Sequence, residues 1–316
     1  MKKASLVLHD RSRHDGRMSR RDSLLAVMVA VVWGVNFVAI HVGVEDVPPL
    51  LFLAIRFVLV AFPMILFVPR PTASWRVVLA VGAFMSLGQF GLLYLALASG
   101  MPAGLASLVL QAQVVFTMLL AWAALGERST TRQLGGAAIG MVGLGVVAWG
   151  FGLDSPVVPL LVTVGAAVSW AVGNVVARAA KVASGLSLVV WSALVVPLPS
   201  LALSFLVDGP DEIRAAMAGF GAAAVASTLY TVVGASLVGY TIFNGLMARH
   251  PAGSVVPFIL LVPPVGMLSA WLALGEVPNR VEAIGAVLMM VGVAVATLAP
   301  RRRRSTTAAP VPTGAL

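Results

Sequence analysis

One arginine in this sequence stands where a charge is energetically expensive. Arg56 lies in the middle of an apolar stretch, residues 48–68, far from both of its ends. A charged side chain in hydrocarbon is costly, so we expect this one to face the protein interior or water. A guanidinium can hold a carboxylate through two parallel hydrogen bonds, which predicts an anchor for an acidic group of a ligand. The structural alternative is an arginine that caps backbone carbonyls or extends to the membrane surface.

Uncharged polar and aromatic side chains accompany this arginine in the apolar stretches. Amide and indole groups supply hydrogen-bond donors and acceptors without a net charge, which suits a zwitterionic ligand. We therefore predict one substrate site that contains them. The alternative for each group is an ordinary hydrogen bond between two membrane helices. The predicted site residues are Trp33, Asn36, Arg56, Gln89, Gln111, Gln113, Trp170 and Asn174.

Membrane helices must carry these residues, because the composition does not suit a soluble protein. Hydrophobic residues make up 59% of the 316 residues, charged residues make up 10%, and the mean hydropathy is +0.99. Soluble domains average about 25% charged residues. A helix of roughly 20 apolar residues crosses a bilayer core of about 30 Å, and only a helix satisfies the backbone there. We expect ten such helices, approximately at residues 23–44, 48–68, 76–98, 102–124, 132–150, 157–177, 186–207, 220–246, 251–274 and 281–299.

Lysine and arginine predict the orientation, because they concentrate in cytoplasmic connections. With a cytoplasmic N-terminus, 18 of the 21 basic residues lie on the cytoplasmic side. Arg214 and Arg280 lie on the outer side, and Arg56 lies within a helix. We expect a multi-pass inner (plasma) membrane protein with both termini in the cytoplasm. Residues 1–21 form a basic tail without a cleaved signal, and residues 300–316 form a disordered tail. The arginine run 301–304 suits anionic lipid headgroups better than nucleic acid.

The two halves of the chain repeat each other. PAGLASLVLQ in the first half corresponds to PAGSVVPFIL in the second, and the motif WGVN corresponds loosely to WAVGN. Most matches fall at a constant offset of 149 residues. The pairs at this offset are Pro102 with Pro251, Gly104 with Gly253, Gly126 with Gly275, Glu127 with Glu276, Gly136 with Gly285, and Gly143 with Gly292.

This repeat predicts the fold class. Each half holds five helices, an odd number, so the two halves must cross the membrane in opposite senses. We therefore expect an all-α integral membrane protein of ten transmembrane helices, built as two inverted five-helix repeats over residues 22–150 and 156–299. In transporters with inverted repeats, the substrate site lies near the membrane midplane, and transport occurs when one half rocks against the other.

The ordered motifs of both halves resemble the EamA family of the drug/metabolite transporter superfamily. The stretches VVWGVNFVAIHVGV, PPLLFLAIRFVLVAFP, GMPAGLASLVLQAQ and SWAVGN and the two LGE turns carry the resemblance, which spans about residues 18–299. It implies export of small metabolites. Within the family, GMPAGLASLVLQAQ and RFVLVAFP are similar to exporters of O-acetylserine and cysteine, which implies amino acids of the cysteine pathway. A broader drug or metabolite efflux carrier is the alternative.

Several other residues leave more than one interpretation open. His41 stands where relatives often carry lysine, and it could couple protons or lie solvated at the interface. No carboxylate is predicted mid-membrane, so facilitated export, exchange and coupling through another group stay open. Glu127 and Glu276 are expected to cap or bridge at a membrane surface, with gating as the alternative. The glycine-rich stretch 135–145 predicts close helix packing, and a homodimer through the fifth or tenth helix is possible.

Rival classes have less support in the residues. The sequence has no GxSxG elbow, no HExxH motif and no carboxylate pair within the predicted helices, so we do not expect an enzyme. We expect no cofactor, no metal and no nucleic-acid partner. The expected partners are a small-molecule substrate and membrane lipid. A structural or receptor-like membrane protein is the remaining class.

Overall fold

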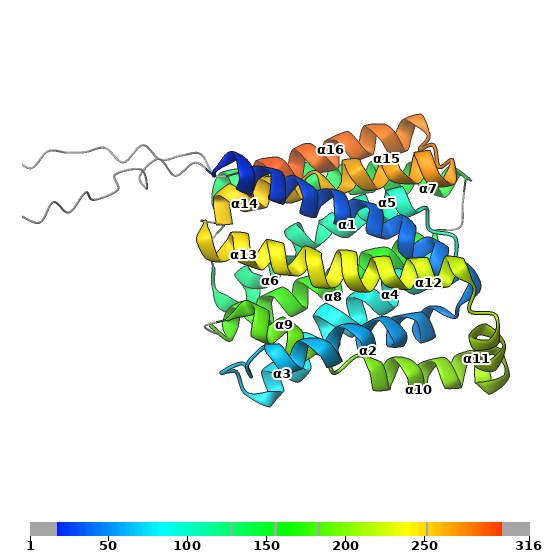
Figure 1. Cartoon of the computed structure of the whole chain (residues 1–316). Coiled ribbons are helices and arrows are strands. Elements are labelled where there is room, and N and C mark those ends of the chain that lie inside the picture. Colours follow the sequence, from blue (N-terminus) through cyan, green and yellow to red (C-terminus); the bar gives the residue numbers. More distant parts are fainter. Residues whose placement is uncertain (1–17, 128, 155–156, 182–183, 251, 299–316) are drawn as a thin grey trace, which may run out of the picture.

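The computed structural model describes residues 18–127, 129–154, 157–181, 184–250 and 252–298, and in these ranges it contains helices and no strands (Figure 1). Residues 1–17 of the predicted N-terminal tail, the whole predicted C-terminal tail and Arg128 lie outside these ranges. The predicted N-terminal tail ends too late, because α1 already begins at Arg20. Within these ranges, ten helical spans are long and apolar enough to cross a membrane, which confirms the predicted all-α membrane fold and its number of spans.

Five of the spans are single helices: α1 (Arg20–Asp46), α2 (Pro49–Phe67), α7 (Thr131–Asp154), α8 (Val158–Ala179) and α16 (Arg280–Thr297). The other five are built from shorter helices in line. These are α3 (Trp75–Val81), η2 (Gly82–Gly88) and α4 (Gln89–Ala98); α5 (Ala103–Val109), η3 (Leu110–Ala112) and α6 (Gln113–Leu125); α9 (Gly185–Ala193) and α10 (Pro197–Val207); α12 (Ala222–Leu229), η4 (Tyr230–Gly239) and α13 (Tyr240–Arg249); and α14 (Ala252–Ile259) and α15 (Val262–Leu274).

The irregular segments recur at equivalent places in the two halves. The fourth span resumes as α6 at Gln113 and the ninth resumes as α15 at Val262, 149 residues later. The π-helical segments η2 and η4 interrupt the third and eighth spans, which also correspond. Prolines explain the ninth-span break, because Pro263 stands at the start of α15, where its missing N–H costs no hydrogen bond.

One helix was not predicted. Residues 208–219 were treated as a connection, but α11 (Gly209–Ala218) occupies them. Its buried residues, Ile213 and Ala216, are three positions apart on one face, and two acidic residues stand in its first turn, where the helix dipole favours them. A search for apolar runs of about 20 residues misses a short amphipathic helix of this kind.

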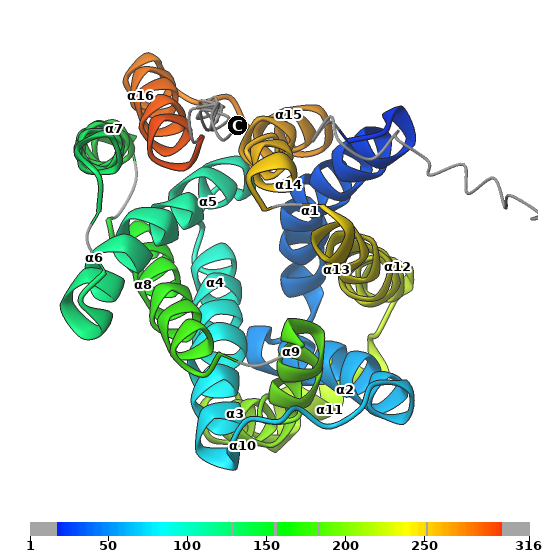
Figure 2. The same ribbon diagram turned by 90° about the vertical axis from the view of Figure 1, so that its left-hand side faces the viewer.

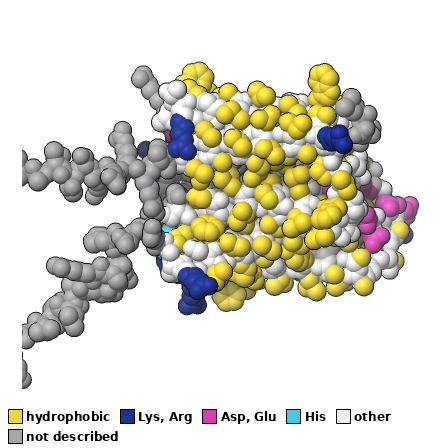
Figure 3. Space-filling view, turned by 90° about the horizontal axis from the view of Figure 1, so that it is seen from above, with side chains coloured by type: hydrophobic (Ala, Val, Ile, Leu, Met, Phe, Trp, Pro, Cys, Tyr) yellow, Lys and Arg dark blue, Asp and Glu magenta, His cyan; other side chains and the backbone are white. Residues whose placement is uncertain are grey.

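The surface fits a protein surrounded by lipid. Large apolar side chains such as Leu66 (79% exposed) and Leu206 (82% exposed) point outward from the spans. On the face seen in Figure 3, hydrophobic side chains cover the middle of the molecule, and acidic side chains gather at one end. The start of α1 and the end of α16 are both at the opposite end, which we call the terminal end (Figure 1). An even number of crossings requires this arrangement.

The predicted glycine packing occurs within the chain, between α7 and α16. A Cβ added to Gly292 of α16 would lie 2.2 Å from the backbone nitrogen of Gly140, and one added to Gly143 would lie 2.4 Å from the nitrogen of Met289. The two backbones are therefore in contact, as in other membrane helix pairs with small residues at the interface. The glycine faces of the fifth and tenth spans are thus occupied by each other. A homodimer stays a prediction.

This packing gives a matched test of stability. We expect Gly292→Ala to destabilise the protein by roughly 1–3 kcal/mol, because the new methyl group would overlap the α7 backbone. Gly135→Ala is the control, since nothing lies within 4 Å of a Cβ at that position. Thermal unfolding in detergent should show a lower Tm for Gly292→Ala alone. Equal Tm values for the two variants would contradict the packing.

Candidate substrate site

A cavity of about 850 Å³ lies at the centre of the helix bundle, and all eight predicted site residues line it. This volume lies within the range of roughly 300–1,000 Å³ that is typical of small-molecule sites. Helices of both halves contribute to its wall, among them α1, α2, α4, α6, α8 and α13. Figure 2 looks along the helices and shows these elements arranged in a ring.

The cavity reaches the terminal end of the bundle. Glu127 after α6, Arg178 near the end of α8, Met247 in α13 and Thr297 at the end of α16 all line it. In the described ranges, none of its lining residues belongs to the connections at the other end. The structure therefore has an open side and a closed side.

Arg56 is buried in the wall of this cavity, with only 2% of its surface exposed. Its Nη1 donates a hydrogen bond to the Tyr94 hydroxyl at 2.9 Å, and its Nη2 donates to Ser236 Oγ at 3.1 Å. The guanidinium also lies over the Phe90 ring, 4.6 Å from the centroid. Both hydrogen bonds go to hydroxyl groups, so the side chain neither caps a carbonyl nor extends to the membrane surface.

The charge of Arg56 is not neutralised by the protein. In the part of the chain that the structure describes, no carboxylate forms an ion pair with it, and its Nε atom is buried without a hydrogen-bond partner. Hydroxyls and an aromatic face offset only part of the cost of removing this cation from water. An anionic group that enters the cavity would therefore gain a strong, charge-assisted interaction here.

Three largely buried amide side chains lie on the cavity wall. Asn36 is 7% exposed, Gln89 is 4% exposed and Gln111 is 7% exposed, and all three line the cavity. The Asn36 Oδ1 atom is buried and has no hydrogen-bond partner among the described residues. A buried unpaired acceptor is unfavourable, so a donor such as an ammonium group would stabilise it.

Gln113 and Asn174 form a contact between helices. Asn174 Nδ2 donates hydrogen bonds to Gln113 Oε1 at 2.9 Å and to Thr117 Oγ1 at 3.3 Å. This contact links α6 to α8 and corresponds to the structural alternative for these two amides. Both residues still line the cavity, but their side chains already have partners.

The two predicted tryptophans also lie on the wall. Trp33 Nε1 donates a hydrogen bond to the backbone oxygen of Ala235 in η4 at 3.0 Å, and its ring packs against Tyr240 and Phe243 with centroids 5.1 and 5.2 Å away. Trp33 therefore joins the first span to the eighth. Trp170 of α8 lines the cavity.

Sequence reasoning missed Ser236, although Arg56 depends on it. The two residues are 180 positions apart, and Ser236 belongs to η4, whose hydrogen-bonding pattern departs from a regular helix. Its hydroxyl donates to the backbone oxygen of Thr231 at 2.8 Å, which leaves its oxygen free to accept from the arginine. No local motif marks a single serine in an apolar stretch as the partner of a distant arginine.

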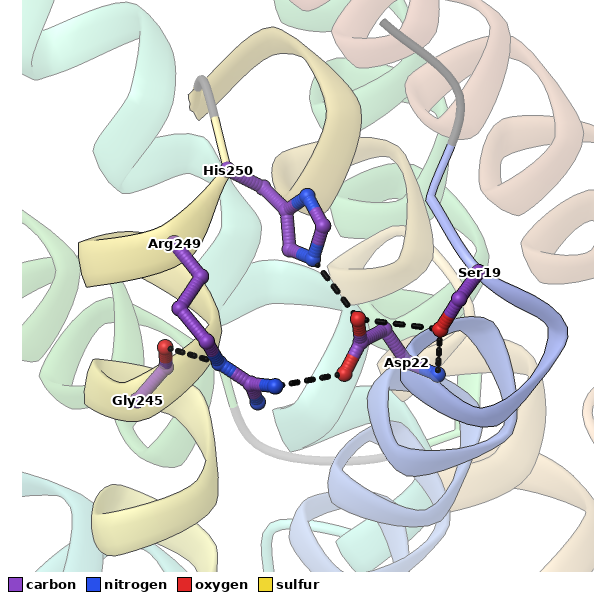
Figure 4. A network of polar contacts seen from close by, with 5 residues as sticks. All are labelled: Ser19, Asp22, Gly245, Arg249 and His250. Carbon is purple, nitrogen blue, oxygen red and sulfur yellow. Dashed lines mark hydrogen bonds and ion pairs between the residues drawn. The ribbon is translucent and has the colours of Figure 1, made fainter. Parts of the chain in front are cut away.

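A polar network lies at the terminal end, where α1 begins (Figure 4). Asp22, only 8% exposed, pairs with Arg249 Nη1 at 2.9 Å and with His250 Nε2 at 2.9 Å. Ser19 donates to the same carboxylate at 3.0 Å and caps the helix by accepting from the Asp22 backbone N–H. The network ties α1 to α13, and both helices carry cavity residues.

This tie predicts a loss of stability when the carboxylate is removed. We expect Asp22→Asn to lower the Tm by several degrees, because one change weakens the contacts to both Arg249 and His250. Asp211→Asn is the control, since the Asp211 side chain is 90% exposed and exposed ion pairs contribute little. Thermal unfolding of both variants in the same detergent checks this. A Tm for Asp22→Asn no lower than that of the control would contradict it.

Comparison with known proteins identifies the relatives of this chain. It is 42% identical over 294 residues to a protein of Salmonella typhimurium (strain LT2) named "Probable amino-acid metabolite efflux pump", which covers 91% of this chain and 98% of the relative. A protein of Streptantibioticus cattleyicolor named "Probable terminal-alkyne amino-acid exporter" is 30% identical, and the match covers 89% of this chain and 95% of that one. A solved crystal structure shares the fold, with a TM-score of 0.60 at 24% identity over 90% of this chain and 99% of that chain.

The family assignment rests on both halves. The EamA-like transporter family matches residues 22–149 and again residues 158–298, so each five-helix half is one copy of the family's repeat. The ten spans and the closely related efflux pumps agree with this assignment. The chain therefore belongs to the EamA-like transporter family, and it is a multi-pass membrane transporter rather than an enzyme.

Proposed function

We propose that this protein exports amino acids or closely related small metabolites across the inner membrane. The observation that carries the proposal is the buried, unneutralised cation of Arg56 in the wall of a central cavity, together with the unpartnered Oδ1 atom of Asn36 on the same wall. An α-amino acid has a carboxylate for the first group and an ammonium for the second. The neutral amides of Gln89 and Gln111 add no net charge, which suits a zwitterion.

The relatives support export as the direction. Two of them are named as an amino-acid metabolite efflux pump and a terminal-alkyne amino-acid exporter. The resemblance of two segments to exporters of O-acetylserine and cysteine makes amino acids of the cysteine pathway our first candidates. With the terminal end in the cytoplasm, as the distribution of basic residues predicts, the cavity is open to the cell interior and ready to load.

Transport would proceed by alternating access between the two inverted halves. In the structure, the cavity reaches one end of the bundle and is closed at the other. An exporter must load from the inside and release to the outside, so a second state with the opposite opening is required. We propose that Arg56 holds the substrate carboxylate while one half moves against the other.

Reconstitution tests this function directly. Purified protein in liposomes should carry labelled cysteine or O-acetylserine across the bilayer, with and without a pH gradient, while empty liposomes should not. Labelled glucose serves as the matched substrate control, because it has no carboxylate. Failure to move any amino acid of a full panel would overturn the proposal.

A broader efflux carrier is the second candidate, because much of the cavity wall is apolar. The wall includes apolar side chains from many helices, namely Phe37, Phe57, Met64, Met85, Leu93, Leu110, Met118, Val190 and Phe243. Such a surface suits larger apolar compounds as well as amino acids. A resistance panel in overexpressing cells separates the two, because only a broad carrier should protect against compounds that have no amino-acid group.

A further inference from the structure

Glu127 and Glu276 occupy the same turn in the two halves of the chain. Gly126 and Gly275 end α6 and α15 in the left-handed conformation, with φ values of 67° and 70°. The N–H groups of the two glutamates point to equivalent carbonyls, those of Ala121 and Ala270, both at 3.4 Å. Backbone conformation is thus the same in the two turns.

The two carboxylates nevertheless have different partners. Glu276 accepts hydrogen bonds from the backbone N–H groups of Ala103 and Gly104 at 2.8 and 2.9 Å, so it binds the start of α5. Glu127 forms an ion pair with Arg178 at 2.7 Å, and both of these side chains are about half exposed. By the repeat, the start of α14 at Ala252 corresponds to the start of α5 at Ala103.

The packing around the two turns differs in the same way. At the closed end, α5 lies against α15, and a Cβ on Gly104 would be 3.1 Å from Met267 Cα. The equivalent pair at the open end is α6 and α14. Residues of both helices line the cavity there, among them Ala121 and Ile259. The glutamate that caps a helix start of the opposite half is therefore on the closed side. Its counterpart, which pairs with the Arg178 side chain of the opposite half, is on the open side.

We propose that Glu127 and Glu276 are alternating latches, each of which closes one end of the transporter by capping a helix of the other half. Glu276 closes the far end in the state seen here. In the opposite state, Glu127 leaves Arg178 and caps the start of α14, while Glu276 leaves α5. The two halves are inverted copies of one structure, so each half can adopt the conformation of the other. The opposite state is then obtained when the two halves exchange conformations. This inference rests on the alternating access of the proposed function.

The repeat also identifies where the released Glu276 carboxylate goes. Arg178 stands eight residues after Trp170, and His41 stands eight residues after Trp33. In the present state, His41 Nε2 contacts Glu45 at 3.4 Å, and His41 Nδ1 is buried without a partner among the described residues. His41 is thus the counterpart of Arg178, and it receives Glu276 when the far end opens.

Distances between spin labels test the latches without any transport assay. The chain has no cysteine, so single cysteines can be introduced cleanly. One labelled pair, Ala124→Cys with Ser254→Cys, reports the terminal end, and another, Ser99→Cys with Val277→Cys, reports the far end. Each pair is combined with Glu276→Ala, with Glu127→Ala, or with Glu212→Ala as a control at an exposed carboxylate in α11.

We expect the two latch variants to shift the populations in opposite directions. Glu276→Ala should lengthen the far-end distance and shorten the terminal-end distance, by a change of about tenfold in the ratio of the two states. Glu127→Ala should favour the state seen here. In the opposite state it removes the cap on α14, whereas in the present state it removes only an exposed ion pair, which contributes little. Glu276→Gln keeps one acceptor, so it should show the same shift as Glu276→Ala to a smaller extent.

Two results would overturn the latches: shifts of the same sign in both variants, or a Glu127→Ala protein whose distances match those of the Glu212→Ala control. Transport by the same proteins separates this inference from the proposed function. If amino acids cross but neither latch variant changes the distances, the latches are wrong and the export function stands. If the reciprocal shifts occur but no amino acid crosses, the latches stand and the assigned substrate class is wrong.

Discussion

Replacing Arg56 with glutamine should reduce amino-acid transport by about 30-fold or more in kcat/KM. The guanidinium is buried, has hydroxyl partners at 2.9 and 3.1 Å, and has no carboxylate partner among the described residues. Loss of the cation removes a buried charge in the cavity wall that a substrate carboxylate can pair with; the other described cation on this wall, Arg178, lies near the terminal end and pairs with Glu127. Uptake of labelled substrate into proteoliposomes measures the effect.

A second substrate separates this role from a structural one. The methyl ester of the same amino acid keeps the ammonium but has no carboxylate. Wild-type protein should transport the acid much better than the ester, and Arg56→Gln should lose most of that preference. Arg214→Gln is the matched control, because Arg214 lies on the exposed surface of α11. Unchanged transport by a normally folded Arg56→Gln protein would rule out the carboxylate anchor.

The sequence predicted the scaffold well because the membrane restricts it so strongly. Long apolar runs must be helices, so the ten spans follow from composition and length. The repeat at an offset of 149 residues predicted the inverted halves. It also holds for a feature that was not anticipated, the break before Gln113, which is equivalent to the break before Val262. Sequence patterns gave no signal for the π-helical segments, because they depend on packing between the halves.

The candidate site was predictable to the extent that single residues stand out. A charge, an amide or a tryptophan in an apolar run is visible by itself, which is why the eight predicted residues could be named. Their pairing was not visible. The bond between Gln113 and Asn174 joins positions 61 residues apart, and the contact of Arg56 with Ser236 joins positions 180 apart. Such pairs depend on helix rotation and depth, which a period of 3.6 residues does not determine across spans.

The two latch glutamates are a further case in which the sequence does not predict the side-chain partners. Glu127 and Glu276 are indistinguishable by sequence, since both follow the motif ALG at the end of a span. Only the structure shows that one binds the start of α5 and the other pairs with Arg178. A single conformation breaks the symmetry that the sequence contains, because in it the cavity reaches one end of the bundle and not the other.

The uncompensated charge of Arg56 leads to a second large effect, at Ser236. Because Ser236 Oγ lies 3.1 Å from Arg56 Nη2, Ser236→Asp would place a carboxylate against the guanidinium. We expect transport to fall about as far as in Arg56→Gln, since the new anion occupies the position that a substrate carboxylate would take. We also expect the Tm to rise, because a buried cation gains a partner. Proteoliposome uptake and thermal unfolding measure the two effects.

A fall in transport together with a rise in Tm distinguishes charge neutralisation from misfolding, because a misfolded variant would lose both transport and stability. Ser236→Asn is the control: it has nearly the same shape and no charge, so it should keep most of the transport and show no rise in Tm. An aspartate variant that transports as well as the asparagine variant would mean that the Arg56 charge does not act on the substrate. The proposed anchor would then have to be abandoned, even though the cavity and the fold around it would remain as described.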